Sequence, residues 1–157
     1  MGMQQNLGTR RRERERMGSL AAGVQFNHIA RDSDDINRLA QFYQEILGFE
    51  RVDSPKFSGF EVVWLRLKPS FFLHIIERKP GTKLPVSSSD DVCRDPSILS
   101  RSHHLAFSVS NFDSFVEGLK EKGIRFSEMV SPNGRTRQVF FFDPDGNGVE
   151  VTTGAME

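Results

Sequence analysis

The sequence predicts an α+β fold built from two copies of one βαβββ module. The first observation is an internal repeat. When the chain is shifted by 76 positions (104 − 28, and likewise 150 − 74), His28 aligns with His104 and His74 aligns with Glu150. The second observation is that each half has one segment with helical spacing of apolar residues, while its other apolar runs are strand-length. A chain of 157 residues can bury one shared core, so we expect two similar modules in one domain.

The first module is expected to open with a strand over residues 24–31, which are rich in β-formers. A helix is expected over 35–47, where apolar residues recur on one face. Ser33 or Asp34 is suited to cap the start of this helix, and Gly48 is suited to end it in the left-handed conformation. Three strand-like runs follow, over residues 50–53, 61–67 and 71–77.

The second module repeats this order, with a strand expected over 103–109 and a helix over 112–122. Ser110 or Asn111 is suited to cap this helix, and Gly123 is suited to end it. Turn residues rich in proline, asparagine and glycine separate the strands that follow. These three strands are expected over residues 125–130, 136–142 and 148–153.

The remaining segments are predicted to be a tail and a linker. Residues 1–22 alternate arginine with glutamate and lack an apolar face, which is typical of a disordered, solvated segment. Residues 79–101 are rich in proline, serine and aspartate, and we expect a surface linker with a short helical turn. The modules then span 23–78 and 102–154, within one domain over 23–154.

Composition narrows the classes of partner. Lysine plus arginine and aspartate plus glutamate both number 21, so the net charge gives no reason to expect nucleic acid or an anionic membrane. No apolar stretch approaches the roughly 18–20 residues that cross a bilayer. Cys93 is the only cysteine, which rules out an intrachain disulfide and favours a reducing compartment. We therefore expect a cytoplasmic protein whose partner is a small molecule.

The repeat places four potential metal ligands in equivalent positions. His28 and His74 are 46 positions apart (74 − 28), and His104 and Glu150 are also 46 positions apart (150 − 104). In each module one ligand belongs to the first predicted strand and the other to the last. If those strands are neighbours in one sheet, both side chains can point to the same side. Imidazoles and carboxylates are good ligands for divalent metals.

A structural role is the alternative for each of these residues. A single histidine on an apolar strand face is more often a satisfied core residue than a ligand. Glu150 is harder to explain in that way, because a carboxylate between two valines needs solvent or a cation. Taken together, the four positions predict one divalent ion, with Zn, Ni, Co, Mn and Fe all compatible. His103 and Cys93 are expected to lie outside this site, and no separate cofactor-binding residue is predicted.

Three stretches of the sequence resemble a known superfamily. They are Asn27-His28-Ile29-Ala30, then 103–109 (HHLAFSV), and 142–151 (FDPDGNGVEV). Together they are similar to the vicinal oxygen chelate superfamily, which includes glyoxalase I, extradiol dioxygenases and the fosfomycin and bleomycin resistance proteins. In detail the chain resembles small plant proteins associated with desiccation and stress. The resemblance covers roughly residues 24–153 and implies curved mixed sheets around one cavity.

The resemblance favours a glyoxalase I-like lyase or isomerase, acting on a small carbonyl compound or its thiol adduct. In that branch the carboxylate ligands act as bases, which would give Glu150 and His74 the catalytic roles, with an imidazole replacing one carboxylate. Glyoxalase I also has a glutathione-binding arginine four positions after its first ligand. Asp32 stands at that position here, and Arg31 lies one position early, on the other side of the strand. The use of glutathione is therefore in doubt.

Two other functions stay open at this point. The resemblance also fits an iron-dependent dioxygenase, in which His28, His104 and Glu150 form a facial triad, although His74 would then close one open position. Alternatively, four protein ligands can hold a structural metal in a non-catalytic metal- or ligand-binding stress protein. One chain could pair its own modules, or two chains could exchange them in a homodimer, because both arrangements supply the same ligands.

Two kinds of side chain near the predicted cavity have competing interpretations. Arg135 and Arg137 could meet an anionic substrate at the cavity mouth, although exposed turn arginines are more often solvated charges. Trp64 and Phe140 occupy equivalent positions in the repeat. We expect both aromatic side chains to line the core or the cavity wall.

Overall fold

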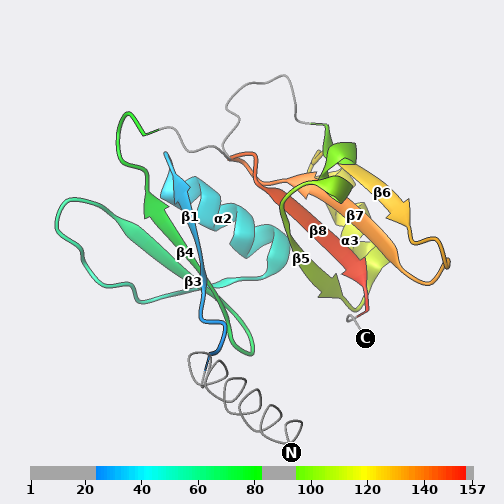
Figure 1. Cartoon of the computed structure of the whole chain (residues 1–157), viewed down its shortest axis with the longest axis horizontal. Helices are drawn as coiled ribbons and strands as arrows, with labels where there is room; N and C mark the ends of the chain where they lie inside the picture. Colours follow the sequence, from blue (N-terminus) through cyan, green and yellow to red (C-terminus); the bar gives the residue numbers. More distant parts are fainter. Residues whose placement is uncertain (1–23, 83–94, 155–157) are drawn as a thin grey trace, which may run out of the picture.

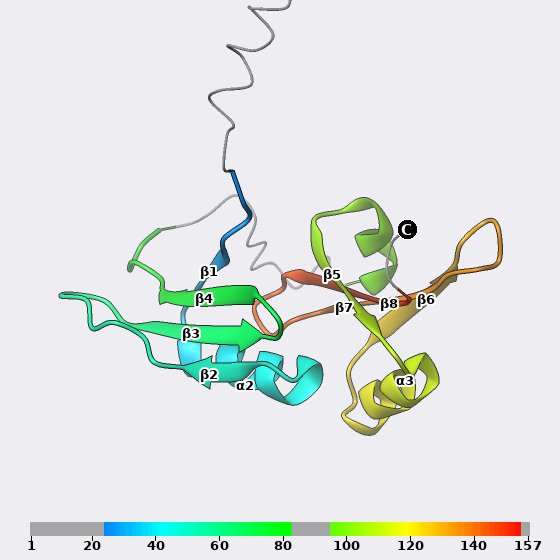
Figure 2. The same ribbon diagram turned by 90° about the horizontal axis from the view of Figure 1, so that it is seen from below.

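A computed structural model describes residues 24–82 and 95–154. The predicted tail, Cys93 and part of the predicted linker lie outside these residues. The chain forms two four-stranded sheets, with the helix of the first module between them (Figure 1). Seen from below, the two modules lie side by side, each with its helix on the lower side of the view (Figure 2). Within the described residues, none of the helices is long and apolar enough to cross a bilayer.

Each module pairs its first strand in parallel with its last. The first sheet has the order β1-β4-β3-β2 and the second has the order β5-β8-β7-β6, with every other pairing antiparallel. This mixed pairing confirms the predicted α+β class. The first module comprises β1 (Ile29–Ser33), α2 (Ile36–Leu47), β2 (Glu50–Val52), β3 (Val62–Leu67) and β4 (Phe71–Glu77). The second comprises β5 (His104–Val109), α3 (Phe112–Glu121), β6 (Phe126–Val130), β7 (Arg137–Phe142) and β8 (Gly148–Thr153), preceded by the short helix η2 (Pro96–Arg101).

The strand register reproduces the repeat seen in the sequence. Ala30 is the partner of His74 across β1 and β4, and Ala106 is the partner of Glu150 across β5 and β8. Trp64 and Phe140 are the antiparallel partners of the same two residues. All of these pairs are related by the 76-position shift, so the two modules are structurally equivalent around His74 and Glu150.

Two local predictions for the first module are wrong. β1 begins at Ile29, so His28 lies just before the strand rather than on it. The cap of α2 is Asp35, whose side chain accepts a hydrogen bond from the backbone N–H of Arg38. Ser33 instead extends β1, because it pairs with Glu77 and is fully buried. The strand therefore includes Ser33, which the sequence suggested as a candidate cap of the helix.

The predicted helix ends are otherwise confirmed. Asn111 caps α3 by accepting a hydrogen bond from the backbone N–H of Ser114. Gly48 ends α2 with φ of 71°, in the region that favours glycine. Gly123 follows α3 with φ of 68°. The short helical turn expected in the linker is η2, which begins after its cap residue Asp95.

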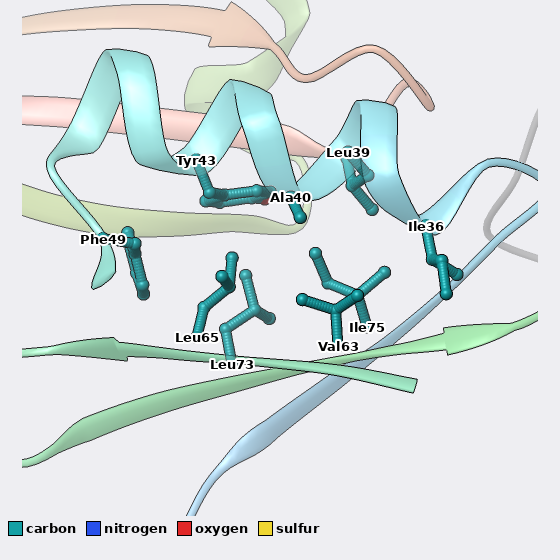
Figure 3. Packing of buried hydrophobic residues seen from close by; sticks show 9 residues of the cluster. All are labelled: Ile36, Leu39, Ala40, Tyr43, Phe49, Val63, Leu65, Leu73 and Ile75. Atoms are coloured by element: carbon teal, nitrogen blue, oxygen red, sulfur yellow. The ribbon is translucent and has the colours of Figure 1, made fainter. Parts of the chain in front are cut away.

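The core of the first module lies between α2 and one face of its sheet (Figure 3). Leu39 and Tyr43 on the helix are fully buried, as are the strand residues Leu65, Leu73 and Ile75. Burial of such side chains stabilises the fold by about 1.5–3 kcal/mol each. Because strand side chains alternate, this packing leaves Trp64 and His74 on the opposite face of the sheet. Sequence alternation thus separates the core from the candidate site.

The second module contacts α2 of the first through apolar and polar side chains. Phe42 packs against the cores of both modules. The hydroxyl of Tyr43 donates a 3.0 Å hydrogen bond to Asp143 in the turn between β7 and β8. Burial raises the pKa of the Asp143 carboxyl above its ordinary value, while hydrogen bonds from Asn147 and Tyr43 oppose that change. This contact ties α2 to the turn that leads into the strand of Glu150.

Replacing Tyr43 with phenylalanine is expected to lower the free energy of unfolding at pH 7 by about 1.5–3 kcal/mol, the range for hydrogen bonds to charged groups. The hydrogen bond lowers the pKa of Asp143 and therefore favours its carboxylate form. Its contribution is present above that pKa and decreases as the pH falls through it. Urea unfolding of both proteins at pH 7 and at about pH 4 measures this difference. A cost that is equal in an Asp143→Asn background would contradict this assignment.

Candidate metal centre

The second module brings His104 and Glu150 together on the face of its sheet opposite α3. His104 begins β5 and Glu150 lies in β8, where Ala106 is its partner. The Nε2 atom of His104 is 2.9 Å from Oε2 of Glu150. Glu150 is only 7% exposed, whereas its neighbours Val149 and Val151 point into the core. The sequence thus forces a carboxylate into a nearly dry position beside an imidazole.

Two further groups hold the side chains of His104 and Glu150 in position by hydrogen bonds. The backbone carbonyl of Ser102 accepts a 2.7 Å hydrogen bond from Nδ1 of His104. The side-chain amide of Gln138 donates a 2.7 Å hydrogen bond to Oε1 of Glu150. With its proton on Nδ1, a neutral His104 presents the lone pair of Nε2 to the other carboxylate oxygen. Two acceptor atoms at this distance need a cation between them, either a proton or a metal ion.

The first module brings its two histidines together in a different way. Their rings stack with centroids 4.1 Å apart, and Nδ1 of His28 is 2.6 Å from the side-chain oxygen of Asn27. Trp64 covers the other face of the His74 ring, with centroids 4.4 Å apart and planes within 5°. Burial, and secondarily the nearby His28, lowers the pKa of His74. His74 is therefore neutral at pH 7 and has a free lone pair.

The two pairs are separate within one chain. Across residues 24–82 and 95–154, no three histidine, cysteine, aspartate or glutamate side chains are close enough to share a metal ion. The space between the modules is filled by α2 and by Phe107, which packs edge-on against Phe49 and Phe71. A groove of about 570 Å³ does lie at this junction, but it is lined by α2 residues such as Phe42 and by Lys122, not by the candidate ligands.

The donor atoms nevertheless fit a divalent ion. Three imidazoles and one carboxylate form the nitrogen and oxygen set that Zn, Ni, Co, Mn and Fe accept. Two ligand atoms at right angles, each about 2.1 Å from one ion, lie about 3.0 Å apart. His104 and Glu150 have this separation, and both are held from behind by hydrogen bonds, as metal ligands usually are. The chain thus presents two pairs of candidate ligands. We call His104 and Glu150, which are held at ligand spacing, the prepared pair, and His28 and His74, whose rings stack, the stacked pair.

Several other predicted residues take structural contacts. Arg137 donates to Asp113 at 2.7 Å and lies over the Phe112 ring, so its guanidinium is engaged on the side of α3. His103 is exposed, as expected. Asp32 forms an ion pair with Arg78. The position where glyoxalase I has a glutathione-binding arginine therefore holds a carboxylate that is already paired.

Sequence reasoning missed Gln138 and Ser102. Gln138 could have been found, because the hairpin register puts it on the same face as Phe140 and Glu150, one row away. The Ser102 carbonyl is a backbone group and gives no signal in a sequence. The stack of Trp64 on His74 follows from their pairing, but only after the register is known.

A family model matches residues 25–151, and its description is the Glyoxalase/Bleomycin resistance protein/Dioxygenase superfamily. The chain belongs to this superfamily. The match covers both modules and all four candidate ligands, so the resemblance inferred from the motifs is confirmed. A curated relative in the superfamily is Glyoxylase I 4 of Arabidopsis thaliana, which is 26% identical over 127 residues. That alignment covers 80% of this chain and 68% of the relative.

Solved structures of the superfamily share the fold. The FosX fosfomycin resistance protein of Listeria monocytogenes, solved as a point variant with Mn(II) and a dihydroxypropylphosphonic acid, aligns with a TM-score of 0.63 and 22% identity. The alignment covers 84% of this chain and 93% of that chain. A lactoylglutathione lyase of Agrobacterium tumefaciens aligns with a TM-score of 0.57 and 22% identity, over 85% and 96% of the two chains. These likenesses establish the architecture.

Proposed function

We propose that this chain is a metal-dependent, glyoxalase I-like lyase or isomerase that acts on a small carbonyl compound or its thiol adduct. The observation that carries the proposal is the facing pair of acceptor atoms on His104 and Glu150, 2.9 Å apart in a nearly dry position. The Arabidopsis relative, named as a glyoxylase, supports the reaction class, and the Mn(II) held by FosX supports a divalent ion.

In this proposal His28, His74, His104 and Glu150 would hold one divalent ion. The ion would supply Lewis-acid stabilisation of the negative charge that develops when a proton leaves carbon next to a carbonyl. The chain's own residues would move the proton from one carbon to the adjacent one. Glu150 is suited to accept it, because Gln138 occupies Oε1 and leaves Oε2 directed at the site. His74 would act as the second proton carrier through the ring nitrogen that does not bind the ion.

The complete ligand set also requires an assembly. Because the two pairs do not meet within the described part of one chain, we propose that a second copy supplies the missing pair in a homodimer. Each site would then combine His28 and His74 of one protomer with the equivalent pair of the other. The exposed side chain of Phe26 and the half-buried Trp64, near the first pair, are apolar surface that such an interface would cover.

The charged side chains in the module of His28 and His74 limit which substrates could bind. Arg78 donates to Asp32 and, at 2.9 Å, to Asp34, so its guanidinium is neutralised by two carboxylates. Arg78 is therefore not free to bind a glutathione carboxylate. We therefore propose a small carbonyl compound, or its adduct with a thiol that lacks a carboxylate. The single cysteine in the chain remains the basis for proposing a cytoplasmic location.

The test is a proton NMR assay with methylglyoxal, a thiol and added Co²⁺, Ni²⁺ or Zn²⁺. We expect metal-dependent conversion of the hemithioacetal to the 2-hydroxy thioester, and the same assay with glutathione to be slower than with cysteamine. Glu150→Gln is expected to abolish conversion, because the amide cannot accept the proton. His103→Ala, which changes an exposed residue that is not a proposed ligand, serves as the control and is expected to retain activity.

Other outcomes would assign a different function. Oxygen uptake with a catechol and Fe²⁺ would identify a dioxygenase, in line with the two histidines and one carboxylate among the ligands. Tight metal binding without turnover on either kind of substrate would identify a structural metal in a binding protein. Either result would overturn the proposed lyase activity.

A further inference from the structure

His74 lies between two aromatic rings. Trp64 covers one face of its imidazole, with the planes within 5°, and His28 covers the other, with the planes within 19°. Trp64 and His74 are direct partners across β3 and β4, so their Cβ atoms project to the same side of the sheet. In the second module the position equivalent to His74 is Glu150, which has no ring, and Phe140 instead meets His104 edge-on, at 81°. The flat stack is therefore specific to the first module.

The geometry of the stack decides which ring can stay in place when a metal binds. The lone pair of an imidazole nitrogen lies in the plane of the ring. Two nearly parallel rings with centroids 4.1 Å apart cannot both point their lone pairs at one ion. At least one of the two histidines must therefore turn out of the stack. The other can keep its ring plane and bind through its exposed edge.

Trp64 and His74 are held more firmly by the surrounding sheet than His28 is. Trp64 pairs with Val52 on one side and with His74 on the other, so it lies in the interior of the sheet. His28 precedes β1, is exposed, and has its polar contact with the adjacent Asn27. His28 is consequently free to rotate, whereas rotation of the His74 ring about its Cβ–Cγ bond would collide with the indole.

We propose that Trp64 is a positioning residue for the metal ligand His74. The indole holds the imidazole plane so that its edge faces the site, and His28 is the ligand that moves on binding. This inference rests on the metal site of the proposed function. It assigns to Trp64 a role beyond that of the core or cavity wall expected from the sequence.

The test measures Co²⁺ affinity by calorimetry on the full chain. Trp64→Leu removes the flat platform and is expected to weaken binding by about 10-fold, the lower end for residues that orient metal ligands. Trp64→Phe keeps a ring that can stack and is expected to bind within about threefold of wild type. Phe72→Leu is the matched control. Phe72 lies two residues before His74 in β4, so it projects to the same side of the sheet, and it has no stacking contact among the described residues.

A double-mutant cycle separates positioning from a general structural role. In a His74→Ala background, Trp64→Leu should have almost no further effect on Co²⁺ affinity, because the ligand that it orients is gone. An equal loss in both backgrounds would overturn the proposal. Equal Co²⁺ affinity of wild type and Trp64→Leu would also overturn the positioning role of Trp64, although it would not contradict the metal site. Failure of wild type to bind Co²⁺ would overturn both the site and this role.

Fluorescence gives an independent readout. Trp64 is the only tryptophan in the chain, so the intrinsic tryptophan emission reports on this stack alone. Co²⁺ binding at His74 is expected to quench the emission of wild type, with the same dissociation constant as calorimetry gives. In His74→Ala the quenching should require the higher Co²⁺ concentrations that calorimetry gives for that variant. Quenching of that variant with the wild-type dissociation constant would show that His74 is not a ligand and contradict the assignment.

Discussion

Replacing Glu150 with glutamine is expected to weaken divalent metal binding by a factor of about 100 or more, since orienting residues alone account for about 10–100-fold. The carboxylate is the only anionic donor among the four proposed ligands. Its Oε2 faces Nε2 of His104, and a neutral amide at this place would neither balance the charge of the ion nor keep two acceptors in position. Calorimetry with Co²⁺ on both proteins measures the change.

The matched control for this experiment is His103→Ala. His103 is adjacent to His104 in sequence, but it is exposed and lies just before β5. We expect it to retain wild-type affinity. If Glu150→Gln binds Co²⁺ as tightly as His103→Ala does, Glu150 is not a ligand, and its burial must be explained by its hydrogen bonds to the protein alone.

Mixing two inactive variants is expected to restore metal binding. One variant carries His28→Ala and His74→Ala, and the other carries His104→Ala and Glu150→Gln. If each site combines the first module of one protomer with the second module of the other, a mixed dimer contains one intact site. Unfolding the two variants together and refolding them should yield about a quarter of the wild-type number of tight sites, because about half of the dimers are mixed.

The alternative arrangement gives the opposite result. If the two modules of one chain closed around a single ion, every site in the mixture would lack one pair. Tight sites would then be absent at all mixing ratios. Refolded wild type is the control for recovery of the dimer. A mixture with no tight sites, alongside wild type that regains about one per chain, would contradict the proposed exchange.

Much of the fold could be predicted because the signals for strands and for helix ends lie in short stretches of the sequence. Alternating apolar residues define the strands, and the cap residues Asn111, Gly48 and Gly123 define helix ends by short-range contacts. The equal spacing of the ligands indicates that His74 and Glu150 lie on equivalent strands, whereas the pairing of the first strand with the last, a condition in the sequence analysis, is seen in the structure. The end of β1 differs from the prediction because Ser33 favours helix caps and turns locally, whereas pairing with Glu77 keeps it in the strand.

The relation between the modules could not be predicted in the same way. It depends on long-range contacts such as Tyr43 with Asp143 and Phe49 with Phe107, whose partners are far apart in the sequence. The spacing of the four ligands is the same whether one chain or two chains supply them. For the same reason, the sequence indicated which residues could bind a metal but not that the two pairs lie apart.

The most direct test of the central claim is the metal content of the purified protein after loading with Co²⁺ and extensive dialysis. Elemental analysis should find about one ion per chain in wild type and almost none in His104→Ala or Glu150→Gln, because either change leaves the prepared pair incomplete. Circular dichroism should show that both variants remain folded. Wild type that retains no metal, or variants that retain as much as wild type, would contradict the proposed site.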